Sequence, residues 1–145
     1  MRRINEQTLA TSTPLRGSCL CGAIRYQLRG TVIAFDLDHC SRCRKSSGSA
    51  FKAELMFEAA EFEWVSGELL VKTYEAPVLK KRPGYRRTFC AVYGGPVPIV
   101  DGDIINVPAG TLDDNPGLGL QRHIFVDFKV AWFDITDTLP RCATK

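Results

Sequence analysis

Residues 17–28 read Gly-Ser-Cys-Leu-Cys-Gly-Ala-Ile-Arg-Tyr-Gln-Leu, and this stretch decides the fold class. Two thiols, Cys19 and Cys21, lie in a turn-like segment that a glycine closes, and apolar side chains then occupy every second position from Ile24 to Leu28. Closely spaced thiols in a turn are typical of a metal site, and strict alternation is typical of a half-buried β-strand. The stretch therefore predicts a metal-binding turn that leads into a strand.

The same alternation recurs along the chain, and Ser-Gly, Pro-Gly, Gly-Gly and Asp-Gly turn signals separate the runs. No segment longer than ten residues keeps a helical period, so helix is expected only as short turns around 46–49 and 112–115. The sequence predicts a mainly β fold. Further strand-like runs lie at 53–57, 61–64, 69–74, 104–107, 123–128 and 131–135.

The size of the chain indicates one domain, because 145 residues with 45% hydrophobic content suffice for a single core. We expect a flexible polar segment at 1–13 and a folded domain at 14–145. The first segment lacks the apolar run of a signal peptide, and no later stretch is long enough to span a membrane. A cytoplasmic location is therefore expected.

The six cysteines favour metal binding over disulfides. A Cys-x-Cys loop is too short for an easy bridge, and a chain without an export signal is kept reduced. Closely spaced thiols in such a chain are more typical of a metal site than of a disulfide framework.

A basic loop at 79–87 carries five cationic residues around a Pro-Gly pair. It could clamp a carboxylated or phosphorylated substrate, or contact nucleic acid with the help of Tyr85. A solvated loop is the simpler interpretation, because the net charge of the chain is only +3 and does not favour nucleic acid as a partner.

A second group of possible ligands lies in the run Asp38-His39-Cys40-Ser41-Arg42-Cys43, which offers a carboxylate and two thiols. Zinc is bound tetrahedrally, so three protein ligands would leave one position open. The remaining thiol near a turn is Cys90, and the residue three positions on is Tyr93, a neutral phenol that ligates zinc poorly.

Five motifs, together with Trp132 and Phe133, agree in order, spacing and residue type with a known family. The motifs lie at 17–26, 39–51, 87–90, 110–113 and 123–125. On these residues the chain resembles the glutathione-dependent formaldehyde-activating enzyme family, which includes centromere protein V. The resemblance extends over residues 15–135 and is far more specific than a single Cys-x-x-Cys motif.

The resemblance implies an Mss4-like, zinc-stabilised β fold with two metal sites. One site would be structural and maps to Cys19, Cys21, Cys90 and the position of Tyr93. The other would be catalytic and maps to Asp38, Cys40 and Cys43. Each site has lost one expected cysteine. Asp38 can still coordinate, whereas the fourth ligand of the first site would be water or an unmatched residue such as Cys142.

About one zinc ion per chain is expected, held most firmly by the three thiols of Cys19, Cys21 and Cys90. The Asp38, Cys40 and Cys43 site is expected to bind zinc more weakly. A metal-free descendant of the family, with its cysteines serving as small buried apolar residues, is the alternative.

The family resemblance implies a carbon-sulfur lyase-like enzyme, in which a thiol such as glutathione adds to an aldehyde or leaves from its adduct. Asp38, His39, Cys40 and Cys43 are the candidate catalytic residues. Three neighbouring cations would attract the anionic sulfur and are the candidate substrate-binding residues: Arg42, Arg44 and Lys45. Two alternatives stay open, a metal-free enzyme with Asp38 or His39 as general base and a non-catalytic binding scaffold.

The remaining aromatic and imidazole side chains are expected to be packed residues. His39 and His123 are the two histidines, and each has apolar or cysteine neighbours in the sequence. Either could act in acid–base chemistry, because the charge of histidine changes near neutral pH. Trp64 and Trp132 lie on strand-like runs and are expected in the core rather than at a substrate platform.

Overall fold

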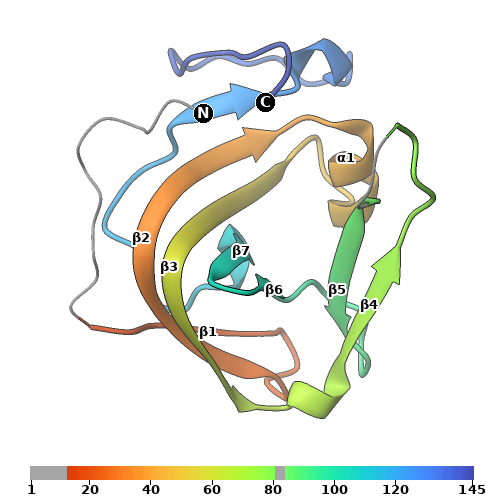
Figure 1. Ribbon diagram of the computed structural model, residues 1–145. Helices are drawn as coiled ribbons and strands as arrows, with labels where there is room; N and C mark the ends of the chain where they lie inside the picture. The colour runs from red at the N-terminus through yellow and green to blue at the C-terminus, as the bar shows by residue number, and fades with distance from the viewer. Residues whose placement is uncertain (1–12, 81–83) are drawn as a thin grey trace.

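The computed structural model describes residues 13–80 and 84–145 as a mainly β fold (Figure 1). The larger sheet has the strand order β1-β2-β3-β7-β6, with β8 pairing parallel to β2, and β4 and β5 form a second, two-stranded sheet. The strands of the larger sheet are β1 Leu15–Ser18, β2 Arg25–Asp38, β3 Lys52–Ser66, β6 Ile99–Asp101, β7 Ile104–Pro108 and β8 Arg122–Ile124. The smaller sheet consists of β4 Val71–Glu75 and β5 Arg86–Cys90.

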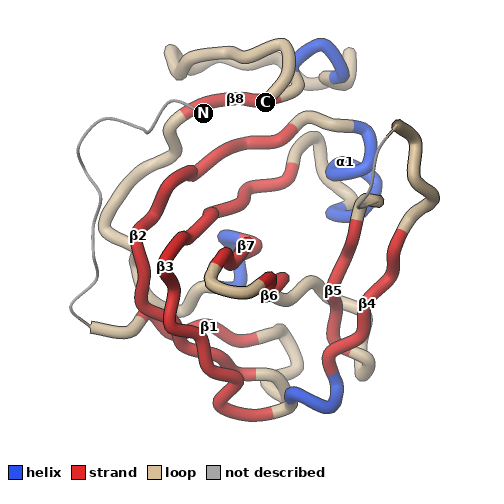
Figure 2. The backbone as a smooth tube through the Cα atoms, viewed as in Figure 1, coloured by secondary structure: helices blue, strands red, loops and turns tan. Residues whose placement is uncertain are grey.

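Two long antiparallel strands, β2 and β3, run side by side along the whole molecule and curve strongly (Figure 2). Their pairing extends from Arg25 opposite Ser66 to Asp38 opposite Lys52, and it contains three register shifts. β-Bulges increase the local twist and bend a strand, which accounts for the curvature. The concave side faces β7 and the core.

The main core lies against β2, β3 and β7. Alternate residues of these strands are fully buried, including Leu28, Phe57 and Ile105. Each such side chain stabilises the fold by about 1.5–3 kcal/mol on burial. Trp64 packs against this cluster, in edge contact with Phe62 at 4.7 Å between ring centroids, in agreement with its expected place.

A short helix, α1 Ser41–Ser47, connects β2 to β3. It ends at Gly48, which has a φ of 67° and donates its N–H to the carbonyl of Arg44. Glycine adopts this left-handed conformation without strain, so it closes the helix after two turns. The hydroxyl groups of Ser46 and Ser47 both donate to the Cys43 carbonyl, which satisfies the helix end.

The 3₁₀ turns η1 Glu68–Leu70, η2 Ala109–Thr111 and η3 Val126–Phe128 complete the described elements. Helical structure at 46–49 therefore begins earlier than predicted, and the turn predicted at 112–115 is instead η2, just before it. The predicted strand at 69–74 begins as η1. Of the predicted strand at 123–128, only the first two residues are extended as part of β8, and η3 follows.

No strand forms at 131–135, and Trp132 is 74% exposed, so its predicted place in the core was wrong. The free edge of β8 is already taken by the C-terminal segment, because His123 N–H donates to the Pro140 carbonyl. The ammonium of Lys129 donates to the carbonyl of Phe133 at 2.5 Å. The Phe133 carbonyl thus accepts a hydrogen bond from a side chain of its own loop, where a paired strand would have supplied a backbone N–H.

Candidate metal centres

The first candidate centre, the Asp38 centre, consists of Asp38, Cys40 and Cys43. Asp38 ends β2, Cys40 precedes α1, and Cys43 is the third residue of that helix. One donor atom from each residue lies within 4.8 Å of the others. Asp38 Oδ1 also accepts the N–H of Cys40 at 2.9 Å, which fixes the carboxylate beside the start of the helix. A strand end and a helix start thus bring the three groups together over six residues.

The electrostatics of the Asp38 centre suit a cation. Burial raises the pKa of the Asp38 carboxyl and of the Cys43 thiol, and the negative charge of Asp38 raises the Cys43 pKa further. Without a cation, these groups cannot all be anionic at low cost. A bound divalent ion reverses this effect and deprotonates a coordinating thiol. The donor set therefore fits a metal such as zinc, with three ligands and one open position.

Two residues that the sequence analysis did not single out for this centre lie beside it. Lys52 faces Asp38 across the β2–β3 pair and forms an ion pair with Glu54. Burial opposes the ammonium charge, but the charge and hydrogen bond of Glu54 act together with Tyr85 and Cys43 to outweigh burial, so the Lys52 pKa is raised. The Tyr85 hydroxyl forms a 2.6 Å hydrogen bond with Ser46, and burial raises its pKa.

A cavity of about 150 Å³ lies beside α1. Asp38, Cys40 and Cys43 do not line it, but Lys52, the cross-strand partner of Asp38, does. The lining of the cavity is mostly apolar, with polar groups from Ser46, Lys52 and Arg87. The Asn106 Oδ1 atom is buried and has no partner among the described residues, and Asn106 also lines this cavity. A few polar groups in an apolar hollow are typical of a small-molecule site.

The second candidate centre, the three-thiol centre, consists of Cys19, Cys21 and Cys90. The Sγ atom of Cys21 lies 3.5 Å from that of Cys19 and 3.7 Å from that of Cys90. Burial opposes ionisation of Cys19, but the 3.4 Å hydrogen bond from Ile24 N–H acts together with the neighbouring thiols of Cys21 and Cys90 to outweigh burial and lower the Cys19 pKa. Donors aimed at sulfur favour thiolates, so this group also fits a soft metal ion.

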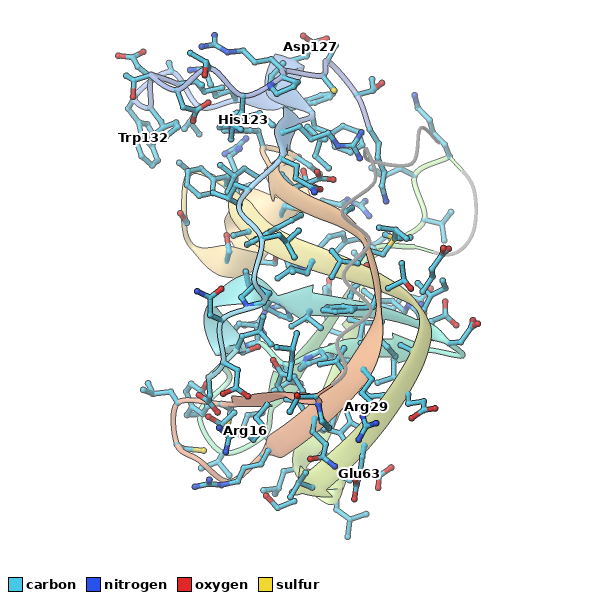
Figure 3. All side chains as sticks on the ribbon, turned by 90° about the vertical axis from the view of Figure 1, so that its left-hand side faces the viewer. Arg16, Arg29, Glu63, His123, Asp127 and Trp132 are labelled. Atoms are coloured by element: carbon cyan, nitrogen blue, oxygen red, sulfur yellow. The ribbon has the colours of Figure 1, made fainter. Side chains whose placement is uncertain are left out.

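Neither Tyr93 nor Cys142 supplies a fourth ligand to the three-thiol centre in the described geometry. The Tyr93 hydroxyl oxygen accepts the N–H of Leu20 at 2.8 Å. Cys142 donates its N–H to the carbonyl of His123 on β8, beside the far end of β2. Figure 3 shows His123 at the end of the molecule opposite to Arg16, which lies on the strand that leads into the Cys19 turn. Cys142 is therefore not part of this centre.

The sequence that contains both cysteine groups matches a known protein family. The family model described as "Glutathione-dependent formaldehyde-activating enzyme" matches residues 14–128. The chain belongs to this family. No curated protein sequence gives a significant match.

Membership of the glutathione-dependent formaldehyde-activating enzyme family confirms the predicted Mss4-like, mainly β fold. The match includes both cysteine groups, and the structure shows that each group could hold a metal ion. In the described part of the chain, no helix is long and apolar enough to cross a membrane.

The predicted substrate-binding cations do not line the cavity in this family member. Arg42 donates to the carbonyl of Pro77 at 3.0 Å, and the side chain of Lys45 is exposed. Arg44 Nε is buried and has no hydrogen-bond partner within the described ranges. Their contact with substrate stays a prediction.

The basic loop is partly tied to the protein. Arg86 forms an ion pair with Asp101 at 3.3 Å, and Arg87 donates to the carbonyls of Ser46 and Gly94. Residues 81–83 of the loop, and residues 1–12 of the expected flexible N-terminal segment, lie outside the described residues. Arg87 thus holds α1 and the turn after β5 in place.

The two histidines form a buried pair that local sequence gave no sign of. Both are fully buried, and His39 Nε2 lies 2.8 Å from His123 Nδ1. His123 Nε2 in turn lies 2.9 Å from the carboxylate of Asp137, and this hydrogen bond lowers the Asp137 pKa. Burial lowers the pKa of His39, so a neutral imidazole is favoured. His39 therefore lies beside the Asp38 centre without being one of its ligand residues.

Proposed function

We propose that the protein is a carbon-sulfur lyase-like enzyme that forms or breaks the adduct of a small thiol, such as glutathione, with an aldehyde. The observation that carries this proposal is the Asp38 centre, which offers three ligands and leaves a fourth position for substrate. Lys52, which pairs with Asp38 across β2 and β3, lines a nearby cavity. The family name, which mentions glutathione and formaldehyde, supports the substrate class.

The reaction joins two substrates and needs no redox partner. The sulfur of the thiolate attacks the carbonyl carbon and forms the C–S bond, while the π electrons move to oxygen, which takes up a proton. In the lyase direction the same steps run in reverse. A zinc ion held by Asp38, Cys40 and Cys43 would stabilise the thiolate and polarise the carbonyl at neutral pH.

The residues of the cavity supply the remaining stabilisation. Lys52 lines the hollow, and its raised pKa favours the charged ammonium, which could stabilise negative charge that develops on the substrate oxygen. The Tyr85 hydroxyl holds Ser46, which is part of the same wall. The apolar remainder of the lining limits access of water, which strengthens these interactions.

Six free cysteines fit a reducing location, and we propose that the protein acts in the cytoplasm. Zinc content should be about one ion per chain. A chain that folds normally and retains no zinc when expressed with added metal would favour a metal-free descendant instead.

The proposal is tested by mixing formaldehyde with glutathione and following adduct formation by NMR, with and without zinc-loaded protein. We expect the wild type to accelerate the reaction and Cys43→Ser to lose that effect. Cys142→Ser is the matched control, because this cysteine lies outside both groups. A wild-type rate equal to the uncatalysed rate would remove support for this activity, though not for the family.

A further inference from the structure

The three-thiol centre offers three soft sulfur ligands and lacks a fourth protein ligand among the described residues. Cys19 and Cys21 come from the turn after β1, and Cys90 comes from the end of β5. No further histidine, cysteine, aspartate or glutamate from residues 13–80 or 84–145 joins the three within 4.8 Å. A metal held by three protein ligands keeps a position for water or an added ligand.

The family resemblance assigns the fourth ligand position to Tyr93, whose contacts in the structure keep it from ligating. Its hydroxyl oxygen is engaged with the N–H of Leu20. Its ring packs closely against Gly95, where an added Cβ would lie 2.2 Å from the ring atom that carries the hydroxyl. A neutral phenol is also a poor zinc ligand. Tyr93 therefore stands beside the thiols without closing the site.

The open side of the centre is accessible to a small ligand. Cys21 is exposed, although Cys19 and Cys90 are buried. A hollow of about 470 Å³ adjoins the centre and is lined by Cys19, Leu20 and Tyr93, among others. This volume lies in the range of small-molecule sites.

Two cations lie near the turns that carry the thiols. Arg87 Nη2 donates to the Gly94 carbonyl at 2.7 Å, and Gly94 N–H donates to the Cys90 carbonyl. An Arg25 guanidinium nitrogen lies 3.8 Å from where a Cβ on Gly22 would be. Three thiolates and a divalent ion carry a net charge of −1, so these guanidinium groups reduce the cost of adding another anion.

We propose that the three-thiol centre binds a divalent soft metal ion and takes up a small exogenous thiol as its fourth ligand, with Tyr93 beside the open position. The added thiol releases its proton to solvent, its sulfur forms a bond to the metal, and a water molecule leaves. No oxidant is needed. The centre thereby binds thiols independently of the Asp38 centre, so its behaviour does not depend on the proposed lyase activity.

Cadmium-113 NMR of the cadmium-loaded full chain tests this directly, because the resonance moves downfield as thiolates replace oxygen ligands. A Cys40→Ser/Cys43→Ser variant leaves only the three-thiol centre. If this variant does not fold, the wild type serves, since three-thiolate and two-thiolate centres give separate resonances. The probe is 2-mercaptoethanol, and ethylene glycol is the control without sulfur.

We expect the three-thiolate resonance to move to the four-thiolate range with 2-mercaptoethanol and to stay in place with ethylene glycol. Tyr93→Cys should show the four-thiolate shift from the start and no response to added thiol. Tyr93→Phe, which keeps the ring but not the hydroxyl, should still respond. A four-thiolate resonance in the wild type without added thiol, an unchanged resonance with thiol, or absence of cadmium binding would each overturn the proposal.

Discussion

Replacing His123 with phenylalanine should destabilise the fold, because the second ring nitrogen of His39 would lose its partner. His39 Nδ1 is buried and already has none among the described residues. The Asp137 carboxylate can only accept, so His123 Nε2 carries the proton and donates to it. His123 Nδ1 is then the acceptor for the N–H of His39 Nε2 at 2.8 Å. Phenylalanine keeps the ring but removes this acceptor, which leaves a fully buried donor without a partner. Such a group costs about 1–3 kcal/mol.

Two further variants separate packing from hydrogen bonding at this site. His123→Ala should lose more than His123→Phe, because it also leaves a cavity, and comparable truncations of buried side chains cost about 2–5 kcal/mol. Asp137→Asn should lose less than either, because Asp137 is 45% exposed and asparagine can still accept a hydrogen bond. The three variants rank the contributions of shape, polarity and charge.

The measurement is urea unfolding of the metal-free chain in the presence of chelator, so that metal binding does not contribute to the midpoint. The midpoint should fall in the order Asp137→Asn, His123→Phe, His123→Ala, with an unchanged slope. A His123→Phe midpoint equal to that of the wild type would refute the assigned hydrogen bond. So would an Asp137→Asn loss as large as that of His123→Phe.

Three other predictions concern ligands, pH and backbone. Asp38→Cys should tighten zinc binding at that centre, because thiolate suits zinc better than carboxylate beside two thiols, and competition with a chromophoric chelator measures it. The pKa of Asp137 is lowered in the fold, so the unfolded chain binds the extra proton below about pH 4, and stability is lost there as pH falls. Asp137→Asn should flatten that acid limb of the unfolding midpoint. Gly67→Ala should lower the thermal midpoint by several degrees, since Gly67 has a φ of 76° and an added Cβ would lie 2.3 Å from the Ala23 carbonyl oxygen.

The sequence predicted what is local. Strict alternation at 24–28 identified the start of β2, because one face of that strand is buried. Cys40 and Cys43, which spacing alone joins, lie within one candidate group in the structure. The strand predicted at 131–135 was wrong. These residues have the apolar content of a strand, but the edge of β8 is already paired with the C-terminal segment.

What the sequence could not predict depends on register and long-range pairing. Lys52 lies beside Asp38 only because β2 and β3 pair in one register over their full length. The histidine pair joins positions 84 residues apart, with no periodic signal between them. Cys142 was a reasonable fourth ligand on chemistry alone, and only the pairing of the C-terminal segment with β8 removes it.

The two cysteine groups lie toward opposite ends of the β2–β3 pair, and this affects the order in which the chain can mature during synthesis. Asp38, Cys40 and Cys43 emerge from the ribosome almost together, so a metal can bind them after closure of a very short loop. The other group spans 69 residues between Cys21 and Cys90, and it is incomplete until β5 has been made. Closing a longer loop costs more chain entropy. A nascent chain therefore completes the Asp38 centre at the end of β2 and the three-thiol centre only after β5 has been made.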